Sequence, residues 1–147
     1  MPLPDLLIDK DADPVLLTRD GVALQAIRID RVAVDKELPH TKRKLARGMP
    51  AHDLAELELD NVRANPEALN FVLEETTPAT IAGRAGFRLV YAWKTRRGLP
   101  LRAVHYGFLE GTSLYRIIYQ AAARHYFERD LPTFERIRQT LRVTAAS

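Results

Sequence analysis

The side chains best suited to bind a ligand lie where charged and polar residues alternate with apolar ones: Arg88, His105, Arg116 and Gln120. If this stretch folds as an antiparallel meander, Arg88, Gly107 and Arg116 share one row of the sheet, and His105 and Gln120 occupy the next two rows. Strands lie about 4.8 Å apart, so the two arginine backbones would be roughly 10 Å apart. Both guanidinium groups could then bind one anion above Gly107. The alternative is that the arginines cover small residues or pair with acids of a helix packed on the sheet.

A second candidate is the basic segment from His40 to Lys44, followed by Arg47. Its consecutive cations, Lys42, Arg43 and Lys44, lie in a stretch without hydrophobic periodicity, which indicates an exposed connection. As a functional site, this segment would dock on an anionic surface or a phosphate group. The alternative is a solvated loop with no partner.

A third candidate is the connection between the meander and the last helix, where Arg124, His125 and Tyr126 precede Phe127. Polar and aromatic side chains on such a loop could form a binding lip. The alternative is that Tyr126 and Phe127 close the edge of the sheet before the helix begins.

Motifs for common catalytic and cofactor chemistry are missing from the sequence. There is no cysteine, which excludes disulfides and thiolate chemistry within the chain. The four histidines lack the spacing of zinc-binding motifs, and neither a phosphate-binding glycine loop nor a nucleophilic-serine turn is present. We therefore expect no metal, no cofactor and no enzymatic activity.

The first of these candidates depends on a predicted three-stranded meander over residues 85–120. A two-residue turn at 97–98 would place Phe87 opposite Phe108, and a turn at 111–112 would keep the same face apolar in the third strand. Since side chains alternate along a strand, a slip of one residue would send the apolar side chains to the other face. RNA-binding sheets expose their aromatic residues, whereas these are needed for the core, so we expect no nucleic-acid partner.

Before the meander, the pattern predicts strands at 15–18 and 24–34 around a turn at 19–21, and further strands at 70–76 and 79–82. A helix should run from Ala51 to about Ala64, because Pro50 opens an apolar stripe of helical period. Its acids lie off the centre of that stripe and are interpreted as solvated or salt-bridged: Glu56, Glu58 and Asp60. After the meander, Asp130 is the expected N-cap of a second amphipathic helix.

Length and composition are those of one globular domain. The chain has 147 residues, and its 22 Lys and Arg are largely offset by 19 Asp and Glu, which leaves a net charge of +3. No apolar run approaches the roughly 20 residues that span a bilayer. The first residues show no signal-peptide pattern, so either the protein is cytosolic or a leader precedes this sequence.

Three segments carry a resemblance to a known superfamily: KRKLARGMPAHDLAELELDNVRA, PATIAGRAGFRLVYAW and ARHYFERDLPTFERIRQTLRV. Over residues 15–143 the chain resembles the PsbP-like superfamily, which includes the Ran-binding Mog proteins and bacterial lipoproteins of unknown role. The resemblance implies an antiparallel sheet sandwiched by helices. It also implies export to the periplasm or cell envelope, with a lipid anchor upstream of Met1. It assigns no functional residue.

We therefore predict an α+β fold in which an antiparallel sheet lies between helices, with an arm at 1–14, one domain at 15–143 and a tail at 144–147. The predicted function is a non-enzymatic binding or assembly module whose partner is another protein. The alternative is a domain that binds or processes a small anionic ligand on the Arg88, His105 and Arg116 face. Without a leader, the protein would be cytoplasmic.

Overall fold

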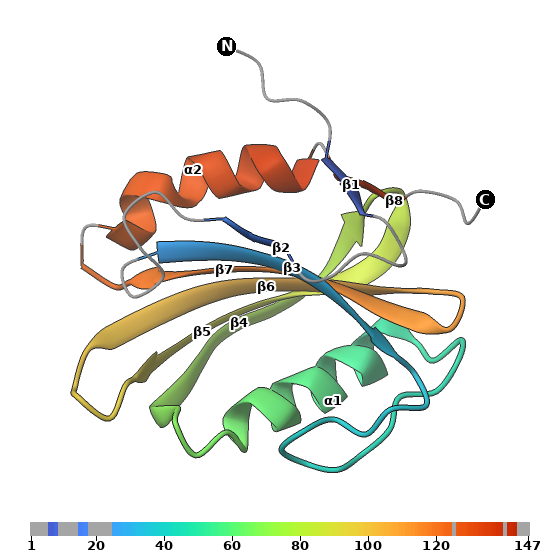
Figure 1. Ribbon diagram of the computed structural model, residues 1–147, viewed down its shortest axis with the longest axis horizontal. Helices are drawn as coiled ribbons and strands as arrows, with labels where there is room; N and C mark the ends of the chain where they lie inside the picture. The colour runs from blue at the N-terminus through green and yellow to red at the C-terminus, as the bar shows by residue number, and fades with distance from the viewer. Residues whose placement is uncertain (1–5, 9–14, 18–24, 125, 140, 144–147) are drawn as a thin grey trace.

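The computed structural model describes residues 6–8, 15–17, 25–124, 126–139 and 141–143. At its centre lies a six-stranded antiparallel sheet with the strand order β2-β3-β7-β6-β5-β4. Two helices cover its opposite faces (Figure 1), so the predicted α+β sandwich is confirmed. The elements are β2 (Val15–Leu17), β3 (Gln25–Ala33), α1 (Ala51–Arg63), β4 (Leu69–Ile81), β5 (Arg84–Lys94), β6 (Pro100–Glu110), β7 (Ser113–Ala122) and α2 (Tyr126–Gln139).

Near the two ends of the chain, β1 (Leu6–Ile8) pairs in parallel with β8 (Leu141–Val143) in a separate two-stranded sheet. The predicted turn at 19–21, the rest of the predicted arm and the tail at 144–147 lie outside the described residues. Among the residues described, no helix is long and apolar enough to cross a membrane.

The hairpin between β6 and β7 has the predicted register. Glu110 pairs with Ser113, so residues 111–112 form a two-residue turn, and Gly111 takes the positive φ of +60°. Glycine meets this requirement without strain. The strands therefore place Tyr106 opposite Ile117, as expected from the sequence.

The hairpin between β5 and β6 differs by one residue from the prediction, which was wrong here. The Thr95 N–H donates to the Leu99 carbonyl (3.0 Å) and the Gly98 N–H to the Thr95 carbonyl (2.8 Å), so the loop holds three residues, 96–98. Gly98 has φ +84°, the left-handed position of a three-residue loop. Phe87 consequently pairs with Gly107 instead of Phe108.

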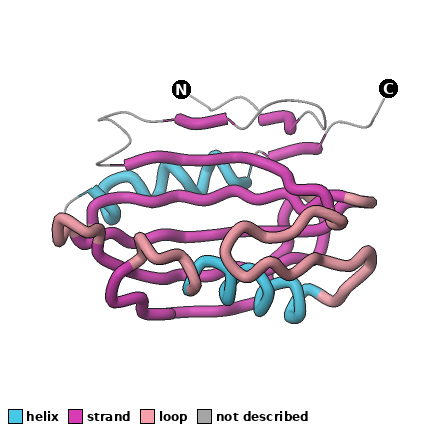
Figure 2. The backbone as a smooth tube through the Cα atoms, turned by 60° about the horizontal axis from the view of Figure 1, so that its bottom comes forward, coloured by secondary structure: helices cyan, strands magenta, loops and turns pink. Residues whose placement is uncertain are grey.

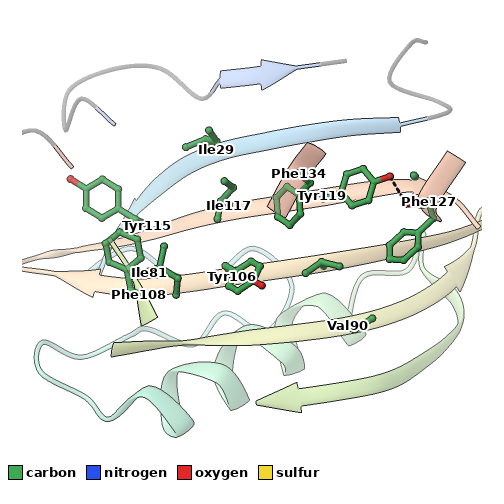
Figure 3. Close-up of a cluster of buried hydrophobic side chains, with 12 residues drawn as sticks. Ile29, Ile81, Val90, Tyr106, Phe108, Tyr115, Ile117, Tyr119, Phe127 and Phe134 are labelled. Carbon is green, nitrogen blue, oxygen red and sulfur yellow. Dashed lines mark hydrogen bonds between the residues drawn. The ribbon is translucent and has the colours of Figure 1, made fainter. Parts of the chain in front are cut away.

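Both faces of the sheet are apolar, and the shift decides which residues lie on each face. Tyr106, Tyr119 and Phe134 belong to the cluster under α2, shown in Figure 3. Phe87 belongs to the cluster under α1, so it lies on the opposite side of the sheet from Tyr106, contrary to the prediction. Figure 2 shows the helices on the two sides of the sheet.

Strand β4 is longer than expected and runs without a break through Pro78, because an edge strand tolerates a residue with no N–H. A register irregularity between Leu73 and Glu75 accompanies two consecutive ion pairs. Glu74 pairs with Arg102 (2.8 Å) and Glu75 with Arg88 (2.9 Å).

Helix α1 begins after Pro50, as predicted, whereas α2 begins one turn before the predicted N-cap. Asp130 lies inside α2, is buried and accepts a hydrogen bond from Gln25 Nε2 (2.6 Å). The earlier start places Phe127 and Phe134 two turns apart, so both rings pack on the sheet.

Candidate functional site

The four polar residues predicted to share one face do not share it. Arg88 pairs with Tyr106 in the sheet and lies on the α2 side, whereas Gly107 pairs with Arg116 on the α1 side. The predicted row of two arginines around Gly107 is therefore wrong. The extra loop residue shifts the register of β5 by one, so each β5 side chain lies on the face opposite to the predicted one. His105 and Arg116 remain on one face.

Arg88 is held by partners on the α2 side. Its Nε donates to the Tyr106 hydroxyl (3.0 Å), and its Nη1 lies 2.9 Å from Glu75 Oε2. Burial lowers the pKa of Arg88, but Glu75 and Tyr106 outweigh it and the pKa is raised. Burial, followed by the Glu135 charge, raises the pKa of the Tyr106 hydroxyl, which donates to Glu135 (3.2 Å). This arrangement stabilises the packing of α2.

A buried ionic network lies between α1 and the sheet. The Nε2 of His105 and the Nη1 of Arg116 lie 3.3 Å and 3.4 Å from Oε1 of Glu58. Arg116 Nε also donates to Asp30 Oδ1 (2.9 Å), and the Tyr91 hydroxyl lies 3.0 Å from His105 Nδ1. Thus the alternative in which an arginine pairs with an acid of the covering helix holds for Arg116.

The charges in this network stabilise one another. Burial raises the pKa of Glu58, but the contacts with His105 and Arg116 outweigh it, so the pKa is lowered overall. Burial lowers the pKa of Arg116, and the charges of Glu58 and Asp30 reverse this and raise it. Desolvation raises the pKa of the Tyr91 hydroxyl well above its ordinary value. The carboxylate and the guanidinium are therefore both charged at neutral pH.

A glutamate beside a histidine could exchange a proton with a substrate only if the substrate reached it. Glu58 is 0% exposed and His105 is 1% exposed, so a solute has no access to the pair. The described residues contain no group of three or more acidic or histidine side chains arranged to hold a metal ion. The network is suited to fixing α1 on the sheet.

Next to this network lies a polar cavity of about 390 Å³, which we name the α1-side cavity. Arg116 and Gln120, two of the predicted residues, line it, whereas Arg88 does not. Arg28 of β3 and Trp93 of β5 also line it, and neither was singled out from the sequence. Only the correct hairpin register brings Trp93 to this face.

The predicted basic segment is an ordered loop, which we name the basic loop, residues 40–47. Leu38 and Leu45 beside and within it are buried. Lys42, Lys44 and Arg47 are exposed, and none of them forms an ion pair within the part of the chain that the structure describes. The loop is thus both anchored and charged.

The third predicted site is partly in the core. Tyr126 is the first residue of α2, and Phe127 is buried and stacked on Tyr119, with ring centroids 5.4 Å apart. The Tyr119 hydroxyl donates to the Phe127 carbonyl (2.8 Å). His125 lies outside the described residues, and Arg124 is part of the turn before α2. Phe127 therefore belongs to α2 and packs on β7, an inner strand, so it does not close the edge of the sheet ahead of the helix as the alternative interpretation had it.

The apolar pattern predicts Glu58 off the centre of the helix stripe, although the sequence carries a signal for its burial. Glu58 follows Leu54 by four residues and precedes Asn61 by three, and all three are buried on one side of α1. The buried arc is thus centred closer to Glu58 than the apolar residues alone indicate.

No family model matches the chain, and neither does any curated protein. Its fold is similar to that of PA94 from Pseudomonas aeruginosa, a protein of unknown function with a suggested regulatory role. The TM-score is 0.65 at 18% identity, over 92% of this chain and 83% of that chain. The fold is also similar to the cyanobacterial PsbP, CyanoP, of Synechocystis sp. PCC 6803. There the TM-score is 0.53 at 9% identity, over 84% and 78% of the two chains. These likenesses define an α+β, PsbP-like fold.

Proposed function

We propose that this domain is a non-enzymatic binding module that docks an acidic surface of a partner protein on its basic loop. The observation that carries the proposal is the combination of fixed backbone and unpaired charge. Lys42, Lys44 and Arg47 are exposed, while the backbone that bears them is held by buried anchors on both sides.

The basic loop is held by buried leucine side chains and by hydrogen bonds to its backbone. Leu38 is 0% exposed and Leu45 is 6% exposed, so both ends of the intervening segment are fixed to the core. The Leu38 N–H donates to the Arg43 carbonyl (2.8 Å). From α1, Asn61 Oδ1 accepts hydrogen bonds from the N–H groups of His40 (2.9 Å) and Thr41 (3.3 Å).

Lys42 has an unusual backbone conformation for a residue with a side chain. Its φ is +62°, in the left-handed region, and its N–H donates to the Leu38 carbonyl (2.9 Å). Such a conformation costs of order 1–3 kcal/mol and persists where the surrounding contacts impose it. A loop already held in one conformation loses less entropy when it binds, which supports a docking role.

The available charge lies in the middle of the basic loop, on either side of Arg43. Arg43 Nη1 lies 3.4 Å from Asp60 Oδ2, so this cation is partly neutralised within the protein. Lys42 and Lys44, on either side of Arg43, are the better contacts for an acidic partner. Opposite charges across an interface speed association and select the partner.

The experiment is affinity capture with wild-type protein and with the double variant Lys42→Glu/Lys44→Glu. The proposal predicts that a protein retained by the wild type at low salt is lost by the variant, while the thermal unfolding temperature is unchanged. Equal retention by both proteins would exclude this surface.

We extend the proposal to location: the domain acts at the bacterial cell envelope, as the resemblance to envelope lipoproteins implies. Fractionation of the full-length protein, together with labelling of lipid attached upstream of Met1, tests this extension. Recovery in the cytoplasm without a lipid would contradict it and would leave the docking surface untouched.

A further inference from the structure

The α1-side cavity lies beside the last turn of α1, over the row of the sheet that contains Ala26, Gln120, Ala103 and Tyr91. Two of these four residues are alanines, which leave space between the sheet and the helix. The volume of about 390 Å³ falls in the range of small-molecule sites. The walls differ chemically from one end to the other.

One end of the cavity carries charge. Arg28 Nε lies 3.0 Å from Asp30 Oδ2, and Arg116 Nε lies 2.9 Å from Asp30 Oδ1, so two guanidinium groups share one carboxylate. Arg116 is also engaged by Glu58. The Arg28 side chain is 57% exposed, and among the described residues Asp30 is its one ionic partner. Its remaining N–H groups are available to a ligand.

Neutral donors lie near this charge. The Gln120 side chain makes no hydrogen bond within the described part of the chain, although it is half-buried. Asn61 also lines the cavity, and its Oδ1 is taken by the backbone of the basic loop, which leaves its NH₂ group. Two acids also line the cavity, but Asp30 is shared by two guanidinium groups and Glu67 pairs with Arg96 (2.9 Å). The groups left open at the polar end are donors, so the matching ligand group is an acceptor, best a carboxylate.

The other end is aromatic. Trp93 and Tyr91 line the cavity with their ring centroids 5.5 Å apart. Ile118 also lines it, from β7, the strand between β6 and β3. The Tyr91 hydroxyl is occupied by His105, so the ring is what Tyr91 offers to a ligand. Arg28 and Trp93 are on strands separated by three spacings, or roughly 14 Å between backbones.

We propose that the α1-side cavity binds a small carboxylic acid with a ring or a branched aliphatic body. Its carboxylate is bound by Arg28 and the Gln120 amide, and its apolar body packs on Trp93 and Ile118. Lys42 and Lys44, the docking residues, do not line the cavity, although His40 at the start of the basic loop does. Neither proposal requires the other.

The chain provides its own reporter, because Trp93 is the single tryptophan. Its indole N–H gives one signal in a ¹H–¹⁵N spectrum of the full chain, and this signal should move in a saturable way on addition of phenylacetate or cyclohexylacetate. Phenylacetamide, which lacks the charge, should bind with an affinity at least about tenfold lower. 2-Phenylethylamine, which carries the opposite charge, should leave the signal in place.

Two arginine variants separate the site from general effects of charge. Arg28→Gln should weaken phenylacetate binding by about tenfold or more, since it removes a charged hydrogen-bond donor. Arg43→Gln is the matched control: that side chain is 59% exposed and pairs with one aspartate, but it does not line the cavity. If Arg28→Gln unfolds the protein, Gln120→Leu tests the same carboxylate contact and should also weaken binding.

Three results would overturn the proposal. The first is that neither carboxylate gives a saturable shift of the Trp93 signal at concentrations up to roughly 1 mM. A dissociation constant well above that value would be too weak for a specific site. The second is equal binding of phenylacetate and phenylacetamide. The third is an equal loss of binding in Arg28→Gln and Arg43→Gln.

Discussion

The Nε2 of His105 lies 3.3 Å from Oε1 of Glu58, and both side chains are almost completely enclosed between α1 and the sheet. The two atoms are close but are not aligned as a hydrogen bond. Arg116 supplies the nearby positive charge that keeps the Glu58 carboxylate ionised. Removing the Glu58 charge would leave the buried Arg116 guanidinium with the one carboxylate of Asp30, which Arg116 already shares with Arg28.

Glu58→Gln should therefore destabilise the fold by about 3–5 kcal/mol at neutral pH, the usual cost of breaking a buried ion pair. The Glu58 pKa is lower in the folded protein than its ordinary value of 4.5. Its contribution is thus present above 4.5 and is lost as the pH falls through the lower folded value. Urea unfolding at several pH values measures this difference between wild type and variant. Glu56→Gln, on the exposed side of α1, is the control and should show no such trend. A difference that stays constant into acid would contradict the assignment.

Gly107→Ala tests the corrected register of β5 and β6. A Cβ atom at Gly107 would lie 2.5 Å from Cζ and 2.7 Å from Cε1 of the buried Phe87 ring. Overpacking of this kind costs about 1–3 kcal/mol. The double variant with Phe87→Leu should recover part of the loss, so the two effects will not add. Strict additivity in chemical unfolding would mean that the ring is not beside Gly107.

Phe134→Ala tests the packing of α2. Phe134 is 0% exposed, and its ring centroid lies 5.2 Å from that of Tyr119 and 6.0 Å from that of Tyr106. Loss of a buried phenylalanine costs about 3–5 kcal/mol. Arg136→Ala, exposed on the same helix, should stay within about 0.5 kcal/mol of the wild type. Similar unfolding midpoints for the two variants would refute this packing.

The sequence was sufficient to predict most of the architecture, because alternation along β6 and β7 and a glycine at 111 define one hairpin unambiguously. The first hairpin could not be defined in the same way. Gly98 fits a two-residue turn and a three-residue loop equally well, and β5 is apolar on both faces, so the pattern did not reveal the slip. Since side chains alternate, one extra loop residue separated Arg88 from Arg116.

The candidate sites were predictable to different degrees. The basic loop was visible as a run of cations, whereas its rigidity depends on Leu38, Leu45 and Asn61, whose burial is a tertiary property. The α1-side cavity was not visible, because Arg28 and Trp93 are 65 positions apart and meet only through the sheet. Glu58 and His105 are of types that are mostly exposed or half-exposed, so their burial required the structure.

The most direct measurement of the docking function compares two charge-reversed variants of equal net charge. Lys42→Glu/Lys44→Glu changes the basic loop, and Lys94→Glu/Arg97→Glu changes exposed cations at the hairpin between β5 and β6. The partner captured by the wild type is quantified on both variants at the same ionic strength. We predict a loss of at least about tenfold for the loop variant alone, because like charges then face each other across the interface. Equal capture by both variants, or an equal loss in both, would contradict it.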